Sequence, residues 1–453
     1  MARTKPSISV LGLGRVGLCF AVCCANRGFH VVGVDVDEEK LDMIGAGKAP
    51  FYEPGLQAML EKAVEKKDLE LTASAGEAVA RSEVSFITVG TPGRPDGSVD
   101  LSQIESACRD VGKALAEKGA WHLVVVRSTV PPGTTGGLIK DVLEISSGLK
   151  CGRGFGLCMN PEFLSEGNAI RGILEPDRIV IGEYDKRSGD ALQAFYEQFH
   201  GNGLSHGLIL RTSLINAELI KYASNAFLAM KVSFANMIAH LCQLLPGADV
   251  VSIMDGVGLD KRIGRAFLNA GLGWGGSCFP KDLAALLKFA EGLGLQLPLV
   301  KATVEVNERQ PLLAIELAKK VLGTLEGKRV ALLGLAFKPG TDDIRGAVSL
   351  KLIEALLAEG ADIVAYDPMA MENVKALLGS TISYASSARE ALREADCCII
   401  VTEWEEFRTL RPEDFKELMR KPVVIDGRRI FRPKDFEQVV HFLAIGRGPR
   451  KLT

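Results

Sequence analysis

The sequence predicts an α/β protein in which two doubly wound domains are joined by a helical segment. Short apolar strands alternate with helices before residue 200, and this alternation returns after residue 328. Apolar strands without polar alternation are typical of a parallel sheet that helices cover on both faces. Between these regions, residues 213–245 form one long helical pattern without a strand signal. We place three domains in the chain of 453 residues, at residues 1–205, 206–310 and 311–453.

The composition argues against several classes of function. The chain carries 54 basic and 56 acidic residues, so its net charge of −2 gives no general attraction to nucleic acid or to an anionic membrane. No uninterrupted apolar run approaches the ~20 residues of a membrane-spanning helix, and the first residues lack the pattern of a signal peptide. We therefore expect a cytoplasmic protein. We expect no metal site, because no cysteine pair has C-x-x-C spacing and the six histidines are scattered.

The first strand ends in a glycine-rich turn, Gly12-Leu-Gly14-Arg-Val16-Gly17, which opens a predicted helix. Gly12 permits a tight turn, Gly14 lets a pyrophosphate approach the backbone, and Gly17 lets helix and strand lie close together. The N-terminus of the helix supplies N–H groups and a partial positive charge for phosphates. Such a turn alone is a weak signal. Within a strand–turn–helix unit it predicts a Rossmann-like dinucleotide site.

Asp35 strengthens the prediction of a dinucleotide site. It closes the second strand, where a carboxylate binds the hydroxyls of the adenosine ribose. An acid at this position repels a 2′-phosphate, which favours NAD over NADP. Thr91 and Thr129 close two later strands, at the edge where a doubly wound sheet presents its ligand-binding residues. The alternative for both threonines is an ordinary loop position.

The most informative stretch is the glycine-rich segment of residues 271–278, which ends in Cys278. Pro280 starts a predicted helix, so Cys278 lies at a helix N-terminus, where a thiolate is stabilised and N–H groups can hold an oxyanion. Asp282 follows within about one turn of that helix. The other cysteines lie in apolar helices and strands, where cysteine behaves as a small hydrophobe. The alternative for Cys278 is a packing role beside a flexible loop.

Two further pairs of polar residues are candidates for chemistry. Lys221 and Asn225 are four residues apart, so one face of a helix presents both. A solvated helix surface explains that spacing equally well. Glu162 and Glu166 lie in the segment NPEFLSEG, and an exposed charged turn is the alternative for them.

A hydride-accepting cofactor and a nucleophilic cysteine together suggest one class of reaction. An alcohol loses hydride and becomes an aldehyde, to which the thiolate adds. The thiohemiacetal then loses a second hydride, and water releases the thioester as an acid. A simple alcohol dehydrogenase needs no cysteine, and an aldehyde dehydrogenase normally carries out only the second oxidation. The residues therefore favour a two-step oxidation of an alcohol to a carboxylate.

Eleven short motifs follow one another along the chain: GLGRVG, FYEPGL, VGTP, STVPPGT, NPEFLSEG, DRIVIG, KYASNAFLA, RIG, GGSCFPKD, GLAFKPGTDDIR and DGRR. With these motifs the chain resembles the UDP-glucose/GDP-mannose dehydrogenase family nearly from end to end. The resemblance implies that residues 1–205 bind NAD and that residues 311–453 bind the UDP-sugar. It also implies a dimerising helix within residues 206–310, and hence a homodimer or a larger homo-oligomer.

The resemblance implies roles for individual catalytic residues. Cys278 corresponds to the nucleophile, and Lys221 with Asn225 would hold the alcohol or the oxyanion. The identity of the general base stays open, since a buried lysine can also do that work. Proton transfer and the positioning of a water would fall to the other catalytic candidates, Asp282, Thr129, Glu162 and Glu166.

The resemblance further implies two sets of binding residues. The expected cofactor contacts are Gly12, Gly14, Val16, Gly17, Asp35, Lys40, Thr91, Thr129, Glu166, Cys278, Lys281 and Arg345. The expected substrate contacts are Glu162, Phe163, Leu164, Lys221, Asn225, Arg262, Gly275, Phe279, Phe337, Lys338 and Arg428. Arg262 would reach the sugar nucleotide of the partner subunit. One departure from the family pattern is Gly346, which follows GTDDIR where the family usually carries an acid.

The expected reaction is the NAD-dependent oxidation of UDP-glucose to UDP-glucuronate. GDP-mannose and other UDP-sugars remain alternative substrates. Ser277 stands before the cysteine, where enzymes that act on N-acetylated hexosamine nucleotides usually carry a histidine. An alternative of another class is a catalytically silent NAD-binding sensor. We expect such a sensor to have lost some of the catalytic set, which is complete in this chain.

Overall fold

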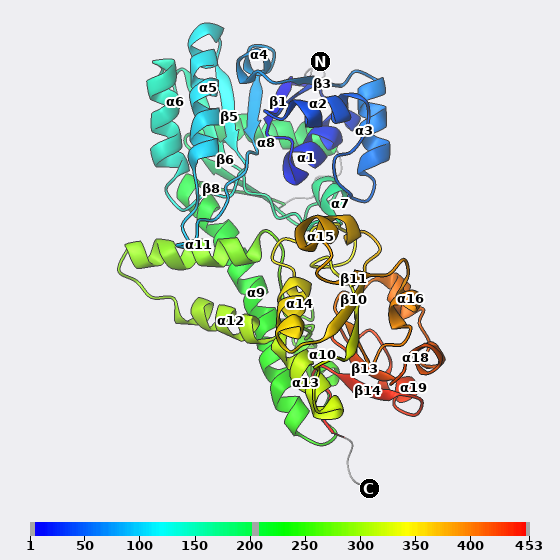
Figure 1. Ribbon diagram of the computed structural model, residues 1–453. Coiled ribbons are helices and arrows are strands. Elements are labelled where there is room, and N and C mark those ends of the chain that lie inside the picture. Colours follow the sequence, from blue (N-terminus) through cyan, green and yellow to red (C-terminus); the bar gives the residue numbers. More distant parts are fainter. Residues whose placement is uncertain (1–4, 202–207, 450–453) are drawn as a thin grey trace. The chain divides into compact units, whose positions relative to one another are not determined.

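Each half of the chain builds its own sheet in the computed structural model, which describes residues 5–201 and 208–449 (Figure 1). The chain divides into two units. The first comprises Met1–Ser224 with Ala284–Phe289, and the second comprises Asn225–Leu283 with Ala290–Thr453. The predicted boundary at residue 205 falls within residues 202–207, outside the described residues.

The sheet of the first unit has the strand order β3-β2-β1-β4-β5-β6-β7-β8. Its strands are β1 (Ile8–Leu11), β2 (Val31–Val34), β3 (Leu69–Thr72), β4 (Val84–Ile87), β5 (His122–Val126), β6 (Phe155–Met159), β7 (Ile179–Glu183) and β8 (Ile209–Ser213). From β1 the chain first adds β2 and β3 on one side and then β4 and the later strands on the other side. This reversal is what the prediction of a doubly wound domain requires.

One pair of strands differs from the predicted parallel sheet. Strands β6 and β7 run antiparallel, with Met159 opposite Gly182, whereas the other neighbours in this sheet are parallel. Parallel neighbours need a crossover that returns the chain to the same end of the sheet. The connection from β6 to β7 holds only the short helix α7 (Ala169–Leu174), which does not make that return.

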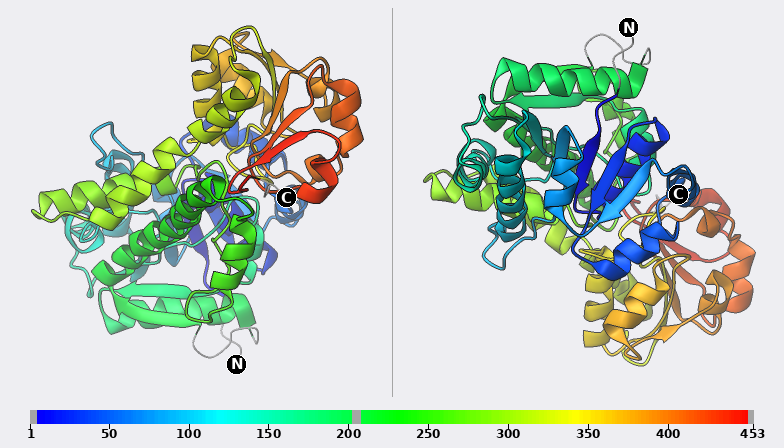
Figure 2. Two further views of the ribbon diagram at one scale, coloured as in Figure 1. Left: turned by 90° about the horizontal axis from the view of Figure 1, so that it is seen from below. Right: turned by 90° about the horizontal axis from the view of Figure 1, so that it is seen from above.

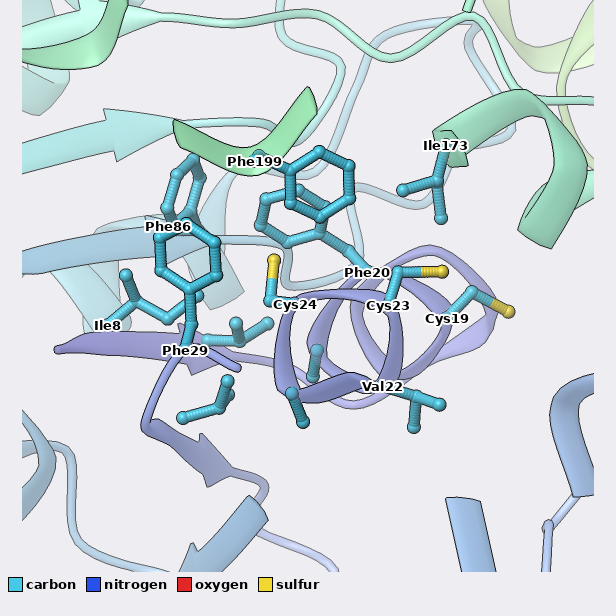
Figure 3. Packing of buried hydrophobic residues seen from close by; sticks show 14 of the residues in the cluster. Ile8, Cys19, Phe20, Val22, Cys23, Cys24, Phe29, Phe86, Ile173 and Phe199 are labelled. Carbon is cyan, nitrogen blue, oxygen red and sulfur yellow. The ribbon is translucent and has the colours of Figure 1, made fainter. Parts of the chain in front are cut away.

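Helices lie on both faces of the first sheet, as the right-hand view of Figure 2 shows. They are α1 (Arg15–Asn26), α2 (Glu38–Gly45), α3 (Leu56–Glu65), α4 (Ala75–Ala80), α5 (Ser102–Lys118), the π-helical turn η1 (Thr135–Ile139), α6 (Lys140–Ser147), α7 and α8 (Lys186–His200). The core on one face is built around α1, whose residues from Gly17 to Ala25 are all buried. Phe20 and Cys24 of α1 contact a cluster that includes Phe86, Phe29 and Phe199 (Figure 3).

The cysteines of this core are structural, as their apolar setting predicted. Cys19, Cys23 and Cys24 all lie in the buried cluster of Figure 3. Burial raises the pKa of the Cys23 thiol to about 12 and that of the Cys24 thiol well above its ordinary value. These thiols therefore stay protonated and unreactive at neutral pH.

The predicted long helix is α9 (Leu214–Leu244), which contributes residues to both units. By length and composition alone, α9 passes as a membrane span, with a mean hydropathy of 1.2. This is weak support for a membrane, because a core helix of a soluble protein passes the same test. The buried Glu218 and Lys221 bond to other parts of the first unit, which is the behaviour of a helix within a folded domain.

The second unit holds a six-stranded sheet in the order β11-β10-β9-β12-β13-β14, and its neighbouring strands are parallel. Its strands are β9 (Arg329–Leu333), β10 (Asp362–Tyr366), β11 (Ser383–Tyr384), β12 (Cys397–Ile400), β13 (Val423–Asp426) and β14 (His441–Ala444). The helices that follow α9 are α10 (Val250–Gly258), α11 (Phe279–Gly292), α12 (Pro298–Arg309), α13 (Leu312–Leu322), α14 (Val348–Ala358), α15 (Met371–Leu378), α16 (Ala388–Leu392), α17 (Glu405–Arg408), α18 (Pro412–Leu418) and α19 (Pro433–Phe436). Two Rossmann-like units, with a helical segment between the two sets of strands in the sequence, confirm the predicted fold class.

Candidate active site

The glycine-rich turn of the first unit has the geometry of a phosphate-binding turn. Gly12 has φ +96°, and a Cβ there would approach the backbone of Val89 to 2.8 Å. A Cβ on Gly17 would lie 1.9 Å from the carbonyl oxygen of Gly12, so only glycine lets α1 begin this close to β1. A Cβ on Gly14, by contrast, would meet nothing within 4 Å. The space beside Gly14 therefore fits a pyrophosphate, and the turn fits NAD.

Asp35 follows β2 and lies beside this turn. Its carboxylate accepts hydrogen bonds from the backbone N–H of Leu13 at 2.8 Å and from Lys40 Nζ at 3.0 Å. Val36, the next residue, is 91% exposed, which offers an apolar surface for an adenine ring. The predicted cofactor residues Asp35 and Lys40 thus form an ion pair at the strand end where a ribose would lie.

The loops that follow β4 and β5 are tied together at the same edge of the sheet. The hydroxyl of Thr91 donates to the carbonyl oxygen of Thr129 at 2.8 Å. Glu218 of α9 is fully buried and accepts hydrogen bonds from the N–H groups of Gly133 and Thr135. Burial raises the pKa of Glu218 above its ordinary value, and those two N–H groups oppose this. Glu218 was not predicted from the sequence, although it lies one turn before Lys221 on α9.

Glu162 and Lys221 form a buried ion pair. Lys221 Nζ lies 2.8 Å from Glu162 Oε1, and the residues are only 2% and 7% exposed. Solvated-surface explanations of Lys221 and Glu162 are therefore wrong. Burial raises the pKa of Glu162, but the charge and hydrogen bond of Lys221, the N–H of Leu164 and the charge of Arg127 hold it below its ordinary value. The pair is placed to move a proton within a buried site.

Glu166 lies four residues after Glu162, in the segment that precedes α7. Its Oε2 atom is 3.9 Å from Arg15 Nε, at the start of α1 beside the glycine-rich turn. The segment is held by Glu53 of the FYEPGL motif, whose carboxylate accepts from the N–H groups of Gly167 and Ala169 at 2.7 Å. The role of Glu53 as an anchor was not predicted, because its partners lie more than 100 residues away.

Cys278 of the second unit lies at the N-cap position of α11, which begins at Phe279, one residue before the predicted start at Pro280. It is exposed, whereas the other cysteines of the chain are buried. Asp282, in the first turn of α11, is buried and accepts from Asn225 Nδ2 and from Lys281 Nζ, each at 2.6 Å. The surface explanation of Asn225 is therefore wrong as well.

The glycine-rich loop before Cys278 is fixed by side-chain amides that were not predicted from the sequence. Asn236 of α9 accepts from the N–H of Gly271 at 2.8 Å, and Gln310 donates to the carbonyl oxygen of that residue. Asn307 of α12 exchanges two hydrogen bonds with the backbone of Trp274. A loop with little side-chain contact of its own is thereby held in one conformation, which fixes the start of α11.

A cavity of about 490 Å³ lies within the second unit beside this loop. Of the predicted substrate residues, it is lined by Gly275, Phe279, Phe337, Lys338 and Arg428. Basic side chains that were not predicted also line it, namely Arg265, Arg408 and Arg429, and the single acidic lining residue is Glu403. Together with Trp274 and Phe267, these groups suit a ligand with a planar ring and a diphosphate.

Backbone strain accompanies this cavity. Phe267 and Arg429 both line it and have φ near +60° although neither is glycine. Strained residues of this kind cluster at ligand sites. Arg428 is oriented by hydrogen bonds to the carbonyl oxygens of Val401 and Gly273. The cavity is therefore preorganised on the side of the DGRR motif.

Two predicted arginines lie outside this cavity. Arg262 forms an ion pair with its neighbour Asp260, and its side chain is 89% exposed, as a residue that reaches a partner subunit would be. Arg345 forms a two-point ion pair with Asp343. The unusual Gly346 has φ +59°, and a Cβ there would lie 3.0 Å from the carbonyl oxygen of Gly276. The departure from the family pattern thus lets this loop lie against the cysteine loop.

Comparison with known proteins gives consistent matches along nearly the whole chain. Three models of the UDP-glucose/GDP-mannose dehydrogenase family match it: the NAD binding domain at residues 6–200, the central domain at 215–309 and the UDP binding domain at 331–433. A UDP-glucose 6-dehydrogenase of Haloferax volcanii is 43% identical, and the match covers 96% of this chain and 100% of that protein. One from Bacillus subtilis is 39% identical over 97% of this chain and 93% of its own length. A solved UDP-glucose dehydrogenase of Pyrobaculum islandicum has a TM-score of 0.90, with 42% identity and coverage of 98% and 99%.

Proposed function

Because this chain belongs to the UDP-glucose/GDP-mannose dehydrogenase family, we propose that it oxidises the C6 alcohol of UDP-glucose to the carboxylate of UDP-glucuronate, with two molecules of NAD. One observation carries the proposal. Cys278 is exposed at the N-terminus of α11, one turn from the buried Asp282–Asn225 pair, while the other cysteines are buried. A simple alcohol dehydrogenase has no use for such a thiol.

In the first oxidation, the C6 hydroxyl loses a proton and C6 loses a hydride. Bound NAD supplies the acceptor for the hydride in each oxidation. The buried Lys221–Glu162 pair is the proposed site of the proton transfer, with Asn225 holding the oxygen of the alcohol. An ion pair at 2.8 Å allows either group to carry the proton, so both remain candidates for the general base.

In the second stage, the thiolate of Cys278 adds to the aldehyde carbon and forms a thiohemiacetal. Loss of hydride and a proton from this adduct gives a thioester on the same sulfur. Water then attacks the thioester, which releases the carboxylate, restores the thiol and yields one more proton. Asp282 and Thr129 are the proposed positions for that water, and Glu162 and Glu166 are the proposed proton carriers.

The cavity of the second unit is the proposed nucleotide site. Lys338 and Arg428 would bind the diphosphate, and the aromatic side chains around Trp274 would contact the nucleoside and the sugar. Of the predicted cofactor contacts, Gly14 and Asp35 have the clearest geometry for NAD. Lys281 and Arg345 are proposed contacts on the second unit.

We further propose that the protein is a cytoplasmic homodimer held together through α9. Several large apolar side chains of this helix are exposed in a single chain: Ile215, Leu219, Phe227, Phe234, Met237, Leu241 and Leu244. Exposed apolar residues repeated along one helix mark a surface that a partner covers. Light scattering of the purified protein tests this: a mass of two chains or a multiple is expected, and a monomer would contradict it.

Counting NADH tests the proposed function. With NAD in excess and a limiting amount of UDP-glucose, two NADH should appear for each sugar nucleotide. A run with GDP-mannose beside it tests the alternative substrate. One NADH per sugar would mean that oxidation stops at the aldehyde, and no NADH with either nucleotide would contradict the proposal.

A further inference from the structure

Arg127 is a buried cation for which the mechanism above has no use. It follows β5 directly and is only 7% exposed. Its guanidinium lies over the ring of Phe20, with 4.5 Å from Cζ to the ring centre. No carboxylate forms an ion pair with it among residues 5–201 and 208–449. A buried charge without such a partner is costly, so its presence calls for a function.

The hydrogen bonds of Arg127 lead to the segment that carries Glu162. Its Nη1 atom donates to Asn160 Oδ1 and, at 2.9 Å, to the hydroxyl of Tyr196. The same hydroxyl donates to Asn160 Oδ1 at 2.5 Å, and Asn160 Nδ2 donates to the carbonyl oxygen of Val180 at 2.8 Å. Asn160 is thus fixed on all sides, two residues before Glu162.

The charge of Arg127 also acts on Glu162 through space. Burial alone would raise the pKa of Glu162, and the charges of Lys221 and Arg127 are among the causes that lower it. Lys221 and Arg127 are therefore two cations around one carboxylate. Such an arrangement keeps Glu162 ionised even though it is almost completely buried.

A cavity of about 80 Å³ joins these groups within the first unit. Arg127, Asn160, Glu162 and Tyr196 all line it, and Arg127 Nε has no hydrogen-bond partner in the part of the chain that the structure describes. A space of this size admits water, which can satisfy that N–H. The other ionisable residues that line it are Glu175, Asp177, Arg178 and His200.

We propose that Arg127 is a positioning residue, which through Asn160 and through its own charge holds Glu162 as an oriented carboxylate against Lys221. This inference rests on the proposed function, since it assigns a task to a residue of the same site. Without the guanidinium, Glu162 is paired with a single cation and takes up a proton more readily. The acidic limb of the pH profile of kcat then moves toward higher pH.

The test is the pH profile of kcat for NADH formation from UDP-glucose. Glu162→Gln identifies the limb that belongs to Glu162 by removing it. Arg127→Met removes the charge and keeps the stem, and should move that limb upward by about one pH unit. Arg127→Lys keeps the charge, and should lower kcat with little movement of the limb. Tyr196→Phe loses one hydrogen bond to Asn160, and should also lower kcat without moving the limb.

A second charge variant covers the case in which Arg127→Met does not fold. Asn160→Asp keeps an oxygen acceptor for Arg127 and places a negative charge beside it, so it should move the limb in the same direction. NAD titration reports whether each variant keeps its first unit intact. The inference would be overturned if the acidic limb of the kcat profile stayed at its wild-type pH in Arg127→Met and in Asn160→Asp, or in whichever of the two folds. A wild-type protein that makes no NADH from UDP-glucose would instead overturn the proposed function, so the two failures are distinct.

Discussion

The two units share one local arrangement of two strands, a glycine and an aspartate, but differ in the structure around it. In each, a glycine with positive φ follows the first strand, and an aspartate follows the second strand. Gly12 has φ +96° and Gly334 has φ +105°. Asp35 bonds to the N–H of Leu13, and Asp367 bonds to the N–H of Leu335, at 2.8 and 2.7 Å. This glycine–aspartate arrangement by itself therefore specifies a turn and not a function.

The units differ in what surrounds the aspartate. In the first, α1 begins at Arg15 directly after the turn, and Asp35 lies beside the exposed Val36. In the second, a long loop separates Gly334 from the start of α14 at Val348. Asp367 is buried there and accepts five hydrogen bonds, from the N–H groups of Leu335, Ala336, Met369 and Ala370 and from Trp404 Nε1.

This difference explains why one unit suits NAD and the other does not. The first unit keeps a helix N-terminus directly after the turn and a carboxylate that accepts three hydrogen bonds, from Leu13, Asp37 and Lys40, and these fit a pyrophosphate and a ribose. In the second unit, the Asp367 carboxylate already accepts five hydrogen bonds from the protein. The long loop there carries Lys338 to the cavity that is rich in basic and aromatic groups. A shared fold thus supports two sites through the loops that follow the same strand.

The largest expected effect comes from replacing the two aspartates in turn. Asp367→Ala leaves five donors without their acceptor, three of them buried and two part-buried, and should destabilise the second unit by about 3–5 kcal/mol. Asp35→Ala should cost about 1 kcal/mol of stability, while weakening NAD and admitting NADP. Urea unfolding and titrations with both cofactors measure these effects. Equal losses of stability in the two variants would break the comparison.

The next effect concerns the site that only the second unit has. Lys338→Met should raise the KM for UDP-glucose about 10- to 100-fold, because a charged contact to phosphate contributes about 1.5–3 kcal/mol. The Kd for NAD should stay unchanged. Lys351→Met, which replaces an exposed lysine of α14 outside the cavity, is the matched control. If the Kd for NAD rises in Lys338→Met while the KM for UDP-glucose stays unchanged, the two sites are assigned to the wrong units.

The smallest expected effect is a pH dependence of stability, which comes from buried polar residues that the first sheet has and the second sheet lacks at the corresponding pair. Ser9 pairs with Ser85 in the first sheet, and the corresponding pair in the second is Ala331 with Cys398. Ser85 bonds to the buried His122, and burial lowers the pKa of His122 to about 3.

In the unfolded chain His122 titrates near its ordinary value of 6.5, so acid protonates the unfolded state first. The stability of the first unit should be independent of this group above pH 6.5, and should fall by about 2 kcal/mol as the pH drops to 5. Calorimetry across this range measures the loss. His122→Gln should remove this part of the pH dependence, and an unchanged slope in that variant would show that His122 is not its source.

The sequence predicted those parts of the molecule that local patterns determine. Apolar strand runs predicted both sheets, and the spacing of Gly12, Gly14 and Gly17 predicted the turn. Cys278 stood out because a glycine-rich loop and a proline surround it. These signals lie within a few residues of one another, so backbone geometry and polarity are enough to interpret them.

The contacts that could not be predicted are those between distant segments. Glu162 meets Lys221 across 59 residues, and Asn225 meets Asp282 across 57. Spacing alone could not separate these buried pairs from solvated surface. The proposed role of Arg127 could not be predicted from the sequence, because it depends on Asn160 and on the hydroxyl of Tyr196 in α8, which lie near Arg127 only in the folded chain. The antiparallel β7 was also missed, since its apolar pattern carries no information on direction.

The most direct test of the account is the mass of the intact protein during turnover. The central claim is that Cys278 carries the sugar as a thioester before water releases it. With NAD and UDP-glucose, an Asp282→Asn variant should hydrolyse this thioester slowly and accumulate a protein heavier by one UDP-glucuronyl group. Peptide mapping should place the added mass on Cys278, and a Cys278→Ser variant should show neither the adduct nor UDP-glucuronate. Full production of UDP-glucuronate by Cys278→Ser, with no adduct in either variant, would contradict the account.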